Sequence, residues 1–109
     1  MNISLGDVWM CKFPLEEDPS TFLPRPVIVL AIESLDVLSV KVTKHAPRDN
    51  NDVPIAKWVY AGLNFPSTAR VSKTIMIDKS QFIYRLGFLH SDDLNEIQTA
   101  YIKFVLSQA

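Results

Sequence analysis

A series of short, strand-like segments followed by one amphipathic stretch most constrains what this chain can fold into. Leu94, Ile97, Tyr101 and Phe104 recur at helical spacing, and Ser91 precedes them as a candidate N-cap, which predicts an α-helix to about residue 107. Several short strands and one terminal helix favour a mainly β fold, a small barrel rather than a βαβ sheet. The predicted strands are 7–13, 27–32, 38–43, 53–55 (a short edge strand), 67–72, 74–78 and 83–89.

Alternation predicts which side chains face the core. In the segment 38–43, Leu38, Val40 and Val42 are expected inside, and Ser39, Lys41 and Thr43 outside. In the segment 67–72, Thr68, Arg70 and Ser72 share one face, and Ala69 and Val71 share the other. Residues 14–24 and 44–52 read as loops, and 56–61 as one or two helical turns ended by Gly62.

Length and composition predict a single domain over residues 1–109. The chain has 109 residues, of which 48% are hydrophobic and 21% charged, ordinary values for a globular protein. No apolar run approaches the roughly 20 residues of a membrane span, and residues 1–5 do not resemble a secretory signal. The single cysteine, Cys11, cannot form an internal disulfide, so we expect a cytoplasmic protein.

Charge is unevenly distributed along the chain. The net charge is −1, but residues 41–79 carry seven basic and three acidic side chains, a local charge of +4. A local positive patch can attract a polyanion even when the whole protein is slightly acidic. Charge alone, however, favours the alternative of a solvated surface.

Arginine and hydroxyl side chains gather at predicted strand ends. Arg25, between two prolines, precedes the strand 27–32, and Thr43 ends the strand 38–43. Residues 67–73 begin a third strand-like segment. No metal-type cluster and no carboxylate pair stand beside them in the sequence. This mixture suits a negatively charged, hydroxyl-bearing polymer such as RNA better than a peptide or a sugar.

Five sequence motifs follow one another in a characteristic order along the chain. They are Gly6-Asp7-Val8-Trp9, Arg25-Pro26-Val27-Ile28-Val29-Leu30, Val42-Thr43, Ala61-Gly62-Leu63 with Pro66-Ser67-Thr68-Ala69-Arg70, and Arg85-Leu86-Gly87-Phe88-Leu89. In these motifs and their order the chain resembles, over essentially its whole length, the MazF/PemK-type toxins of bacterial type II toxin–antitoxin systems. The resemblance implies an SH3-like barrel with a C-terminal helix and a homodimer. It also implies a metal-independent, sequence-selective endoribonuclease that needs no cofactor, cleaves single-stranded RNA and binds a cognate antitoxin.

The resemblance assigns catalytic roles to Arg25, Thr43 and Arg70, which match two catalytic residues of the family and an arginine used by its plasmid-borne members. Ser72 falls where those members have a catalytic aspartate, so this position offers no carboxylate base. The family's Gly-x-Glu-Gln stretch in the first loop is replaced here by residues 18–22, so contacts of that loop with antitoxin and RNA are expected to differ.

Metal-free RNA cleavage uses the 2′-OH as internal nucleophile, so the protein supplies proton transfer and charge stabilisation. Arginine stays charged and binds phosphate oxygens in pairs, which assigns Arg25 and Arg70 to charge stabilisation and proton donation. Thr43 and Ser72 would fix the phosphate by hydrogen bonds. His45 has a suitable intrinsic pKa for acid–base work, or is a solvated loop histidine. Further substrate-binding candidates are Lys41, Lys73, Ser67 and Thr68.

Each assignment has a structural alternative. Arg25 could pair with Glu16 or Glu17, Arg70 could pair with Asp78, and Thr43 could be only a strand former. Two other functions also stay open: a degenerate module that binds antitoxin or DNA without cutting, and a gyrase poison of the CcdB type. Toxins of the CcdB type depend on a terminal Trp-Gly-Ile, whereas this chain ends in 106-LSQA-109.

Overall fold

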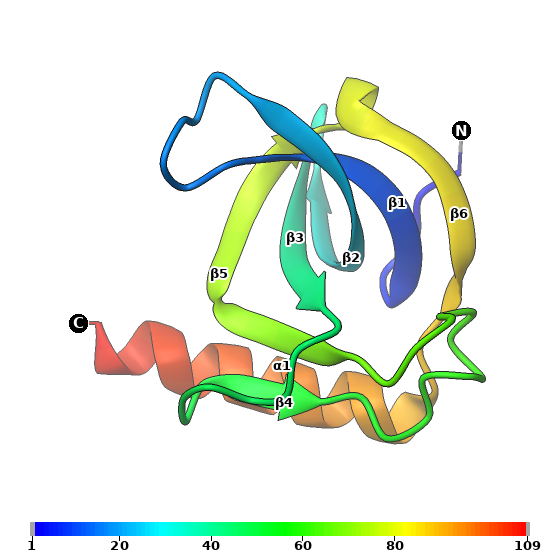
Figure 1. Cartoon of the computed structure of the whole chain (residues 1–109), viewed down its shortest axis with the longest axis vertical. Coiled ribbons are helices and arrows are strands. Elements are labelled where there is room, and N and C mark those ends of the chain that lie inside the picture. Colours follow the sequence, from blue (N-terminus) through cyan, green and yellow to red (C-terminus); the bar gives the residue numbers. More distant parts are fainter. Residues whose placement is uncertain (1, 109) are drawn as a thin grey trace.

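The structure, a computed structural model that describes residues 2–108, is an antiparallel sheet with one C-terminal α-helix (Figure 1). This confirms the predicted mainly β fold class. The strand order in the sheet is β4-β5-β3-β2-β1-β6. Along the chain the elements are β1 (Asp7–Pro14), β2 (Phe22–Glu33), β3 (Asp36–Thr43), β4 (Asp52–Pro54), β5 (Thr68–Asp78), the 3-10 helix η1 (Lys79–Gln81), β6 (Phe82–Phe88) and α1 (Ser91–Ser107).

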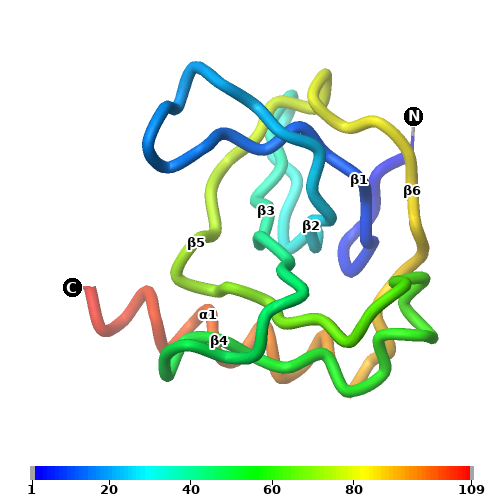
Figure 2. The backbone as a smooth tube through the Cα atoms, viewed as in Figure 1, coloured from blue at the N-terminus to red at the C-terminus, as the bar shows by residue number. Residues whose placement is uncertain are grey.

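A sharp bend in β5 curls the sheet. Ser39 of β3 lies opposite Ile75, but Lys41 lies opposite Arg70, so residues 71–74 of β5 face a single position of β3. The Thr74 hydroxyl donates a hydrogen bond of 2.7 Å to the Val71 carbonyl inside this bend. Figures 1 and 2 show the chain turning a corner there. The two strands predicted at 67–72 and 74–78 are therefore one bent strand.

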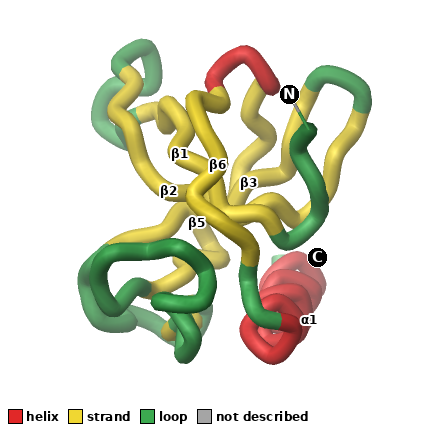
Figure 3. The backbone as a smooth tube through the Cα atoms, turned by 90° about the vertical axis from the view of Figure 1, so that its right-hand side faces the viewer, coloured by secondary structure: helices red, strands yellow, loops and turns green. Residues whose placement is uncertain are grey.

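Two apolar clusters fill the two sides of the curled sheet. The first lies under α1, where Ile97 is fully buried and Leu94, Tyr101 and Phe104 pack against it. Figure 3 shows α1 to one side of the strands. The second cluster contains no helix residue and is enclosed by the sheet, and it includes the predicted packing residues Trp9, Cys11 and Phe13. Burial raises the pKa of the Cys11 thiol to about 12, so this cysteine is an unreactive core residue.

The two edge strands, β4 and β6, are not paired with each other. The segment that follows β4 bridges them with a single helical turn, in which the Ala61 N–H donates to the Lys57 carbonyl at 3.2 Å. Gly62 ends this turn with a φ of 85°, as the sequence predicts. A Cβ atom on Gly62 would lie 2.2 Å from the Leu86 carbonyl oxygen of β6, so only glycine allows this approach.

Three local predictions are wrong. The loop expected at 14–24 is shorter, because β2 already begins at Phe22. The first part of β2 contains Pro24 and Pro26, which have no N–H to donate. They are tolerated there because β3 pairs with β2 only from Val27 onward, so the residues before Val27 have a ladder partner on one side only, β1. Ser39 and Thr43 are buried rather than exposed, since the curled sheet covers both of its faces. The N-cap of α1 is His90, not Ser91; the His90 Nδ1 atom accepts from the Asp92 N–H at 3.1 Å.

No helix within residues 2–108 is both long and apolar enough to cross a membrane.

The contact between Gly62 and β6 predicts a large stability difference between two glycine substitutions. Gly62→Ala should lower the free energy of unfolding by about 3 kcal/mol or more, because a strained φ is combined with a backbone clash. Gly6 has a similar φ of 86° but would meet only the Leu94 side chain, at 3.1 Å, so Gly6→Ala should cost about 1–2 kcal/mol. Urea unfolding of both variants measures the difference, and equal losses would contradict the role given to this contact.

Candidate active site

A groove of about 370 Å³ opens where the first part of β2 and the end of β3 separate. Its walls come from five places along the chain, so the fold and not the local sequence assembles it. Met10 of β1 and Tyr84 of β6 line one side, and the loop 62–67 lines the other. The polar side chains of the groove are Arg25, Thr43, Lys44, His45, Asn64 and Ser67.

Strand register brings Arg25 and Thr43 to this groove together. The β2–β3 ladder ends with Val27 opposite Lys41, and continuing it by two residues places Arg25 opposite Thr43. Directly opposed residues of antiparallel strands project from the same face of a sheet. Beyond Val27 the β2–β3 ladder ends, although Arg25 still pairs with Cys11 of β1 and Thr43 with Thr68 of β5, and both residues line the groove. The structure thus brings together these two sequence-predicted residues.

Thr43 is held in place by its neighbours. Thr43 is buried and lies opposite Thr68 of β5. Its Oγ1 atom accepts a hydrogen bond from the backbone N–H of His45 at 3.3 Å. A hydroxyl that accepts one hydrogen bond retains its proton for donation to another group. The Thr43 hydroxyl can therefore donate to an anion in the groove.

Arg25 is half-buried, and among residues 2–108 no carboxylate forms an ion pair with it. The alternative in which Arg25 pairs with Glu16 or Glu17 is therefore wrong; Glu16 contacts two lysines instead. The Arg25 charge also acts on Lys41. Desolvation is the main cause that lowers the pKa of the Lys41 ammonium, and repulsion from Arg25 comes next. Positive charge at the groove is thus incompletely compensated.

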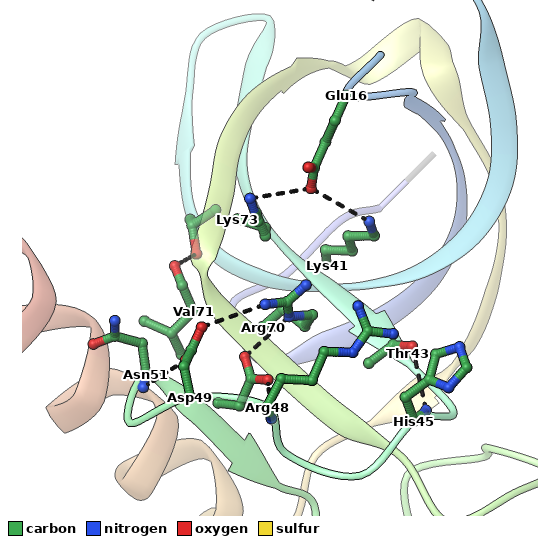
Figure 4. A network of polar contacts seen from close by, with 12 residues as sticks. Glu16, Lys41, Thr43, His45, Arg48, Asp49, Asn51, Arg70, Val71 and Lys73 are labelled. Carbon is green, nitrogen blue, oxygen red and sulfur yellow. Dashed lines mark hydrogen bonds and ion pairs between the residues drawn. The ribbon is translucent and has the colours of Figure 1, made fainter. Parts of the chain in front are cut away.

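Arg70 lies outside the groove and is paired with carboxylates of the 48–52 loop (Figure 4). Its Nε atom donates to Asp52 Oδ1 at 3.1 Å and its terminal nitrogen donates to Asp49 Oδ2 at 3.4 Å. The hydrogen bond to Asp52 is the main cause that raises the pKa of Arg70. The alternative pairing with Asp78 is wrong, because Asp78 lies at the far end of β5 and caps η1.

Lys41 and Lys73 approach one carboxylate oxygen from neighbouring strands (Figure 4). Glu16 Oε1, from the β1–β2 loop, lies 3.2 Å from the Lys73 ammonium and 3.9 Å from the Lys41 ammonium. Neither lysine lines the groove. Sequence reasoning placed both lysines at a substrate site but gave no part to Glu16 in holding them.

The other predicted residues divide between groove and core. His45 is exposed and lines the groove, as does Ser67, whose hydroxyl donates to the Phe65 carbonyl at 2.7 Å. Thr68 is buried outside the groove, and Ser72 is half-buried in the bend of β5. Sequence reasoning missed Phe65, whose ring lies 4.7 Å from the Lys44 ammonium, as well as Asn64 and Tyr84. The one available signal was their position after a glycine-ended turn or on the last strand.

Two aromatic residues of the turn before Gly62, Trp58 and Tyr60, do not line the groove. Trp58 packs against the cluster under α1. Tyr60 is exposed and contacts Phe88 and His90 edge-on, away from the groove. Over residues 2–108, no group of three or more His, Cys, Asp or Glu side chains is arranged to hold a metal ion.

The family model of PemK-like, MazF-like toxins of type II toxin–antitoxin systems matches residues 4–105. The chain belongs to this toxin family. The match confirms the resemblance seen in the sequence, and it spans every strand, the groove and most of α1.

Solved structures of MazF toxins share the fold at low sequence identity. Mycobacterium tuberculosis toxin MazF-mt6 is 19% identical, with a TM-score of 0.71 over 89% of this chain and 93% of that one. An endoribonuclease in complex with its cognate antitoxin, from a mycobacterial species, is 16% identical, with a TM-score of 0.74 over 95% of each chain. MazE–MazF of Deinococcus radiodurans is 14% identical, with a TM-score of 0.74 over 94% and 95%. No curated protein sequence matches this toxin.

The buried Arg70–Asp52 pair predicts unequal effects of two aspartate substitutions. The side chains of Arg70 and Asp52 are 10% and 0% exposed, so Asp52→Ala leaves a buried charge unpaired and should cost about 3–5 kcal/mol of unfolding free energy. Asp49 is 42% exposed, so Asp49→Ala should cost less than about 1 kcal/mol. Chemical denaturation of both variants tests this, and similar losses would show that the Asp52 pair is no more important than the surface one.

Proposed function

We propose that this toxin is a metal-independent endoribonuclease that cleaves single-stranded RNA to a 2′,3′-cyclic phosphate and a 5′-hydroxyl. The observation that carries the proposal is the meeting of Arg25 and Thr43 in one groove, where Arg25 has no carboxylate partner within residues 2–108. Membership of the MazF-like family supports the same activity.

In the proposed reaction the substrate provides its own nucleophile. The 2′-OH attacks the adjacent phosphorus and the bond to the 5′-oxygen breaks, so negative charge rises on the phosphate oxygens in the transition state. The Arg25 guanidinium, with its fork of donors, stabilises that charge and supplies a proton to the departing oxygen. The Thr43 hydroxyl donates to a phosphate oxygen and fixes its position against β3.

His45 is the candidate for the base that takes the proton of the 2′-OH. It lies in the groove two residues after Thr43, and its backbone N–H is bonded to the Thr43 hydroxyl. Imidazole titrates in the range that proton transfer near neutral pH requires.

Two carboxylates hold Arg70, through Nε and through one of its two terminal nitrogens. Asp49 is the exposed and more distant partner, so the terminal nitrogen of Arg70 can leave it for a phosphate while Nε stays on Asp52. A purely positioning role, in which Arg70 anchors the 48–52 loop that follows the groove residues of β3, needs no such change.

The proposed partners follow from family membership. Two structurally similar proteins are described in complex with an antitoxin, one as an endoribonuclease with its cognate antitoxin and the other as MazE–MazF. We extend this to a cognate antitoxin for the present toxin, a homodimeric state and a cytoplasmic location.

A non-cutting antitoxin-binding or DNA-binding module is the second candidate. Two observations favour it: Ser72 stands where some relatives have an aspartate, and Arg70 is neutralised by two carboxylates. Incubation of the purified protein with a long mRNA, with and without EDTA, separates the candidates. Discrete EDTA-resistant fragments with cyclic phosphate ends support the nuclease, and intact RNA at every protein concentration supports the module.

Arg25→Ala should lower the rate of RNA cleavage by at least about 100-fold, because charge on the transition state loses its stabilising group. Arg25→Lys should fall between this variant and the wild type, since it keeps the charge but not the fork. Lys103→Ala, an exposed change on α1, is the charge-matched control and should leave the rate unchanged. Single-turnover cleavage and thermal melting measure rate and fold, and undiminished cleavage by a folded Arg25→Ala would remove the assignment.

A further inference from the structure

A cationic pair beside the groove is occupied by a carboxylate of the protein itself. Glu16 reaches from the β1–β2 loop to Lys73 at 3.2 Å and Lys41 at 3.9 Å (Figure 4). Its side chain is 55% exposed, whereas that of Lys41 is only 15% exposed. The acid of this contact therefore lies on a surface loop with more than half of its side chain in solvent, whereas Lys41 lies largely shielded on a central strand.

Charge around the two lysines is otherwise unbalanced. Desolvation and the nearby charges of Arg25, Arg70 and Lys73 all lower the pKa of Lys41, and Glu16 is the acid that opposes them. The carboxylates on Arg70 belong to Asp49 and Asp52, which form no ion pair with either lysine within residues 2–108. Removing Glu16 would leave two adjacent ammonium groups that bind an anion.

The position of the lysines relates them to the groove. Lys41 lies two strand positions before Thr43, a rise of roughly 6.6 Å, and opposite Val27, two positions from Arg25. An anion on Lys41 and Lys73 would thus lie along the strand from an anion between Arg25 and Thr43. This is the relation of neighbouring phosphates in an extended single strand.

We propose that Lys41 and Lys73 form a second phosphate subsite for the substrate strand, and that Glu16 fills this subsite in the free protein as an internal competitor. The inference rests on the proposed ribonuclease function and adds a component to it. RNA gains full affinity only by displacing Glu16, so Glu16 lowers the affinity of strands that reach the subsite.

Glu16→Gln tests the proposal with a matched control. The probe is a fluorescein-labelled, randomised 12-nucleotide DNA single strand, which lacks the 2′-OH and cannot be cleaved. At low salt, the Glu16→Gln variant should bind this DNA about two- to fivefold more tightly than Glu17→Gln, the control that removes the same charge at the adjacent position. The slope of log affinity against log salt should become more negative by about 0.7 per lysine freed, because those lysines now release counterions.

A second background shows whether the gain passes through the lysines. In Lys73→Met the advantage of Glu16→Gln should shrink, since one ammonium of the subsite is gone. The subsite would be overturned by equal affinities of the Glu16→Gln and Glu17→Gln variants, or by an undiminished gain in Lys73→Met. If the wild type nevertheless cleaves RNA, the proposed ribonuclease function is unaffected by that result. Selective tightening in a protein that never cuts RNA would support the subsite and remove the nuclease. Absence of binding by every variant would overturn the subsite.

Discussion

The antiparallel pairing of β3 with β2 on one side and β5 on the other is the interaction on which the rest of the structure depends. Its register pairs Lys41 with Val27 on one side and with Arg70 on the other, and it brings Arg25 and Thr43 to the same groove. A shift of one residue would turn these side chains to the cluster under α1 and remove Val40 and Val42 from that cluster. The buried Val40, Val42 and Ile28 therefore hold the register, and with it the site.

Compensation of charge separates the basic residues near the groove into three kinds. Arg70 is neutralised in the protein interior by Asp52, Lys41 and Lys73 share one flexible acid, and Arg25 has no carboxylate partner among the described residues. Competition from the protein's own carboxylates for a bound phosphate is therefore weakest at Arg25, intermediate at the two lysines and strongest at Arg70. Under the proposed function, we therefore expect Arg25, with the polar groove residues around it, to be the first group to bind an incoming phosphodiester.

Sequence periodicity predicted the fold class, most strand positions and the helix, because apolar alternation reports which face of an element is buried. It failed where tertiary structure overrides the local pattern. Ser39 and Thr43 alternate with valines and so read as exposed, but the curled sheet also buries their face. The bend at Val71–Thr74 looks like a strand break in sequence, yet a side-chain hydrogen bond carries the strand through it.

For the site, the sequence indicated Arg25 and Thr43, since both stand at predicted strand ends within family-like motifs. The sequence did not predict which residues the charged side chains pair with, because these ion pairs join side chains far apart in the chain. Arg70 pairs with Asp52 across the β4–β5 ladder, and Glu16 crosses from another loop to Lys73. The groove residues Asn64, Phe65 and Tyr84 come from segments whose nearness to β3 only the fold determines.

A double-mutant cycle on RNA cleavage tests most directly whether the opposed guanidinium and hydroxyl act on one phosphodiester. The single-turnover rate would be measured for the wild type, Arg25→Ala, Thr43→Val and the double variant, with Thr43→Ser as the variant that keeps the hydroxyl. Groups that act as a unit give strongly non-additive losses, so the double variant should be little slower than Arg25→Ala alone. Losses that multiply independently, or a fully active Thr43→Val, would contradict the account.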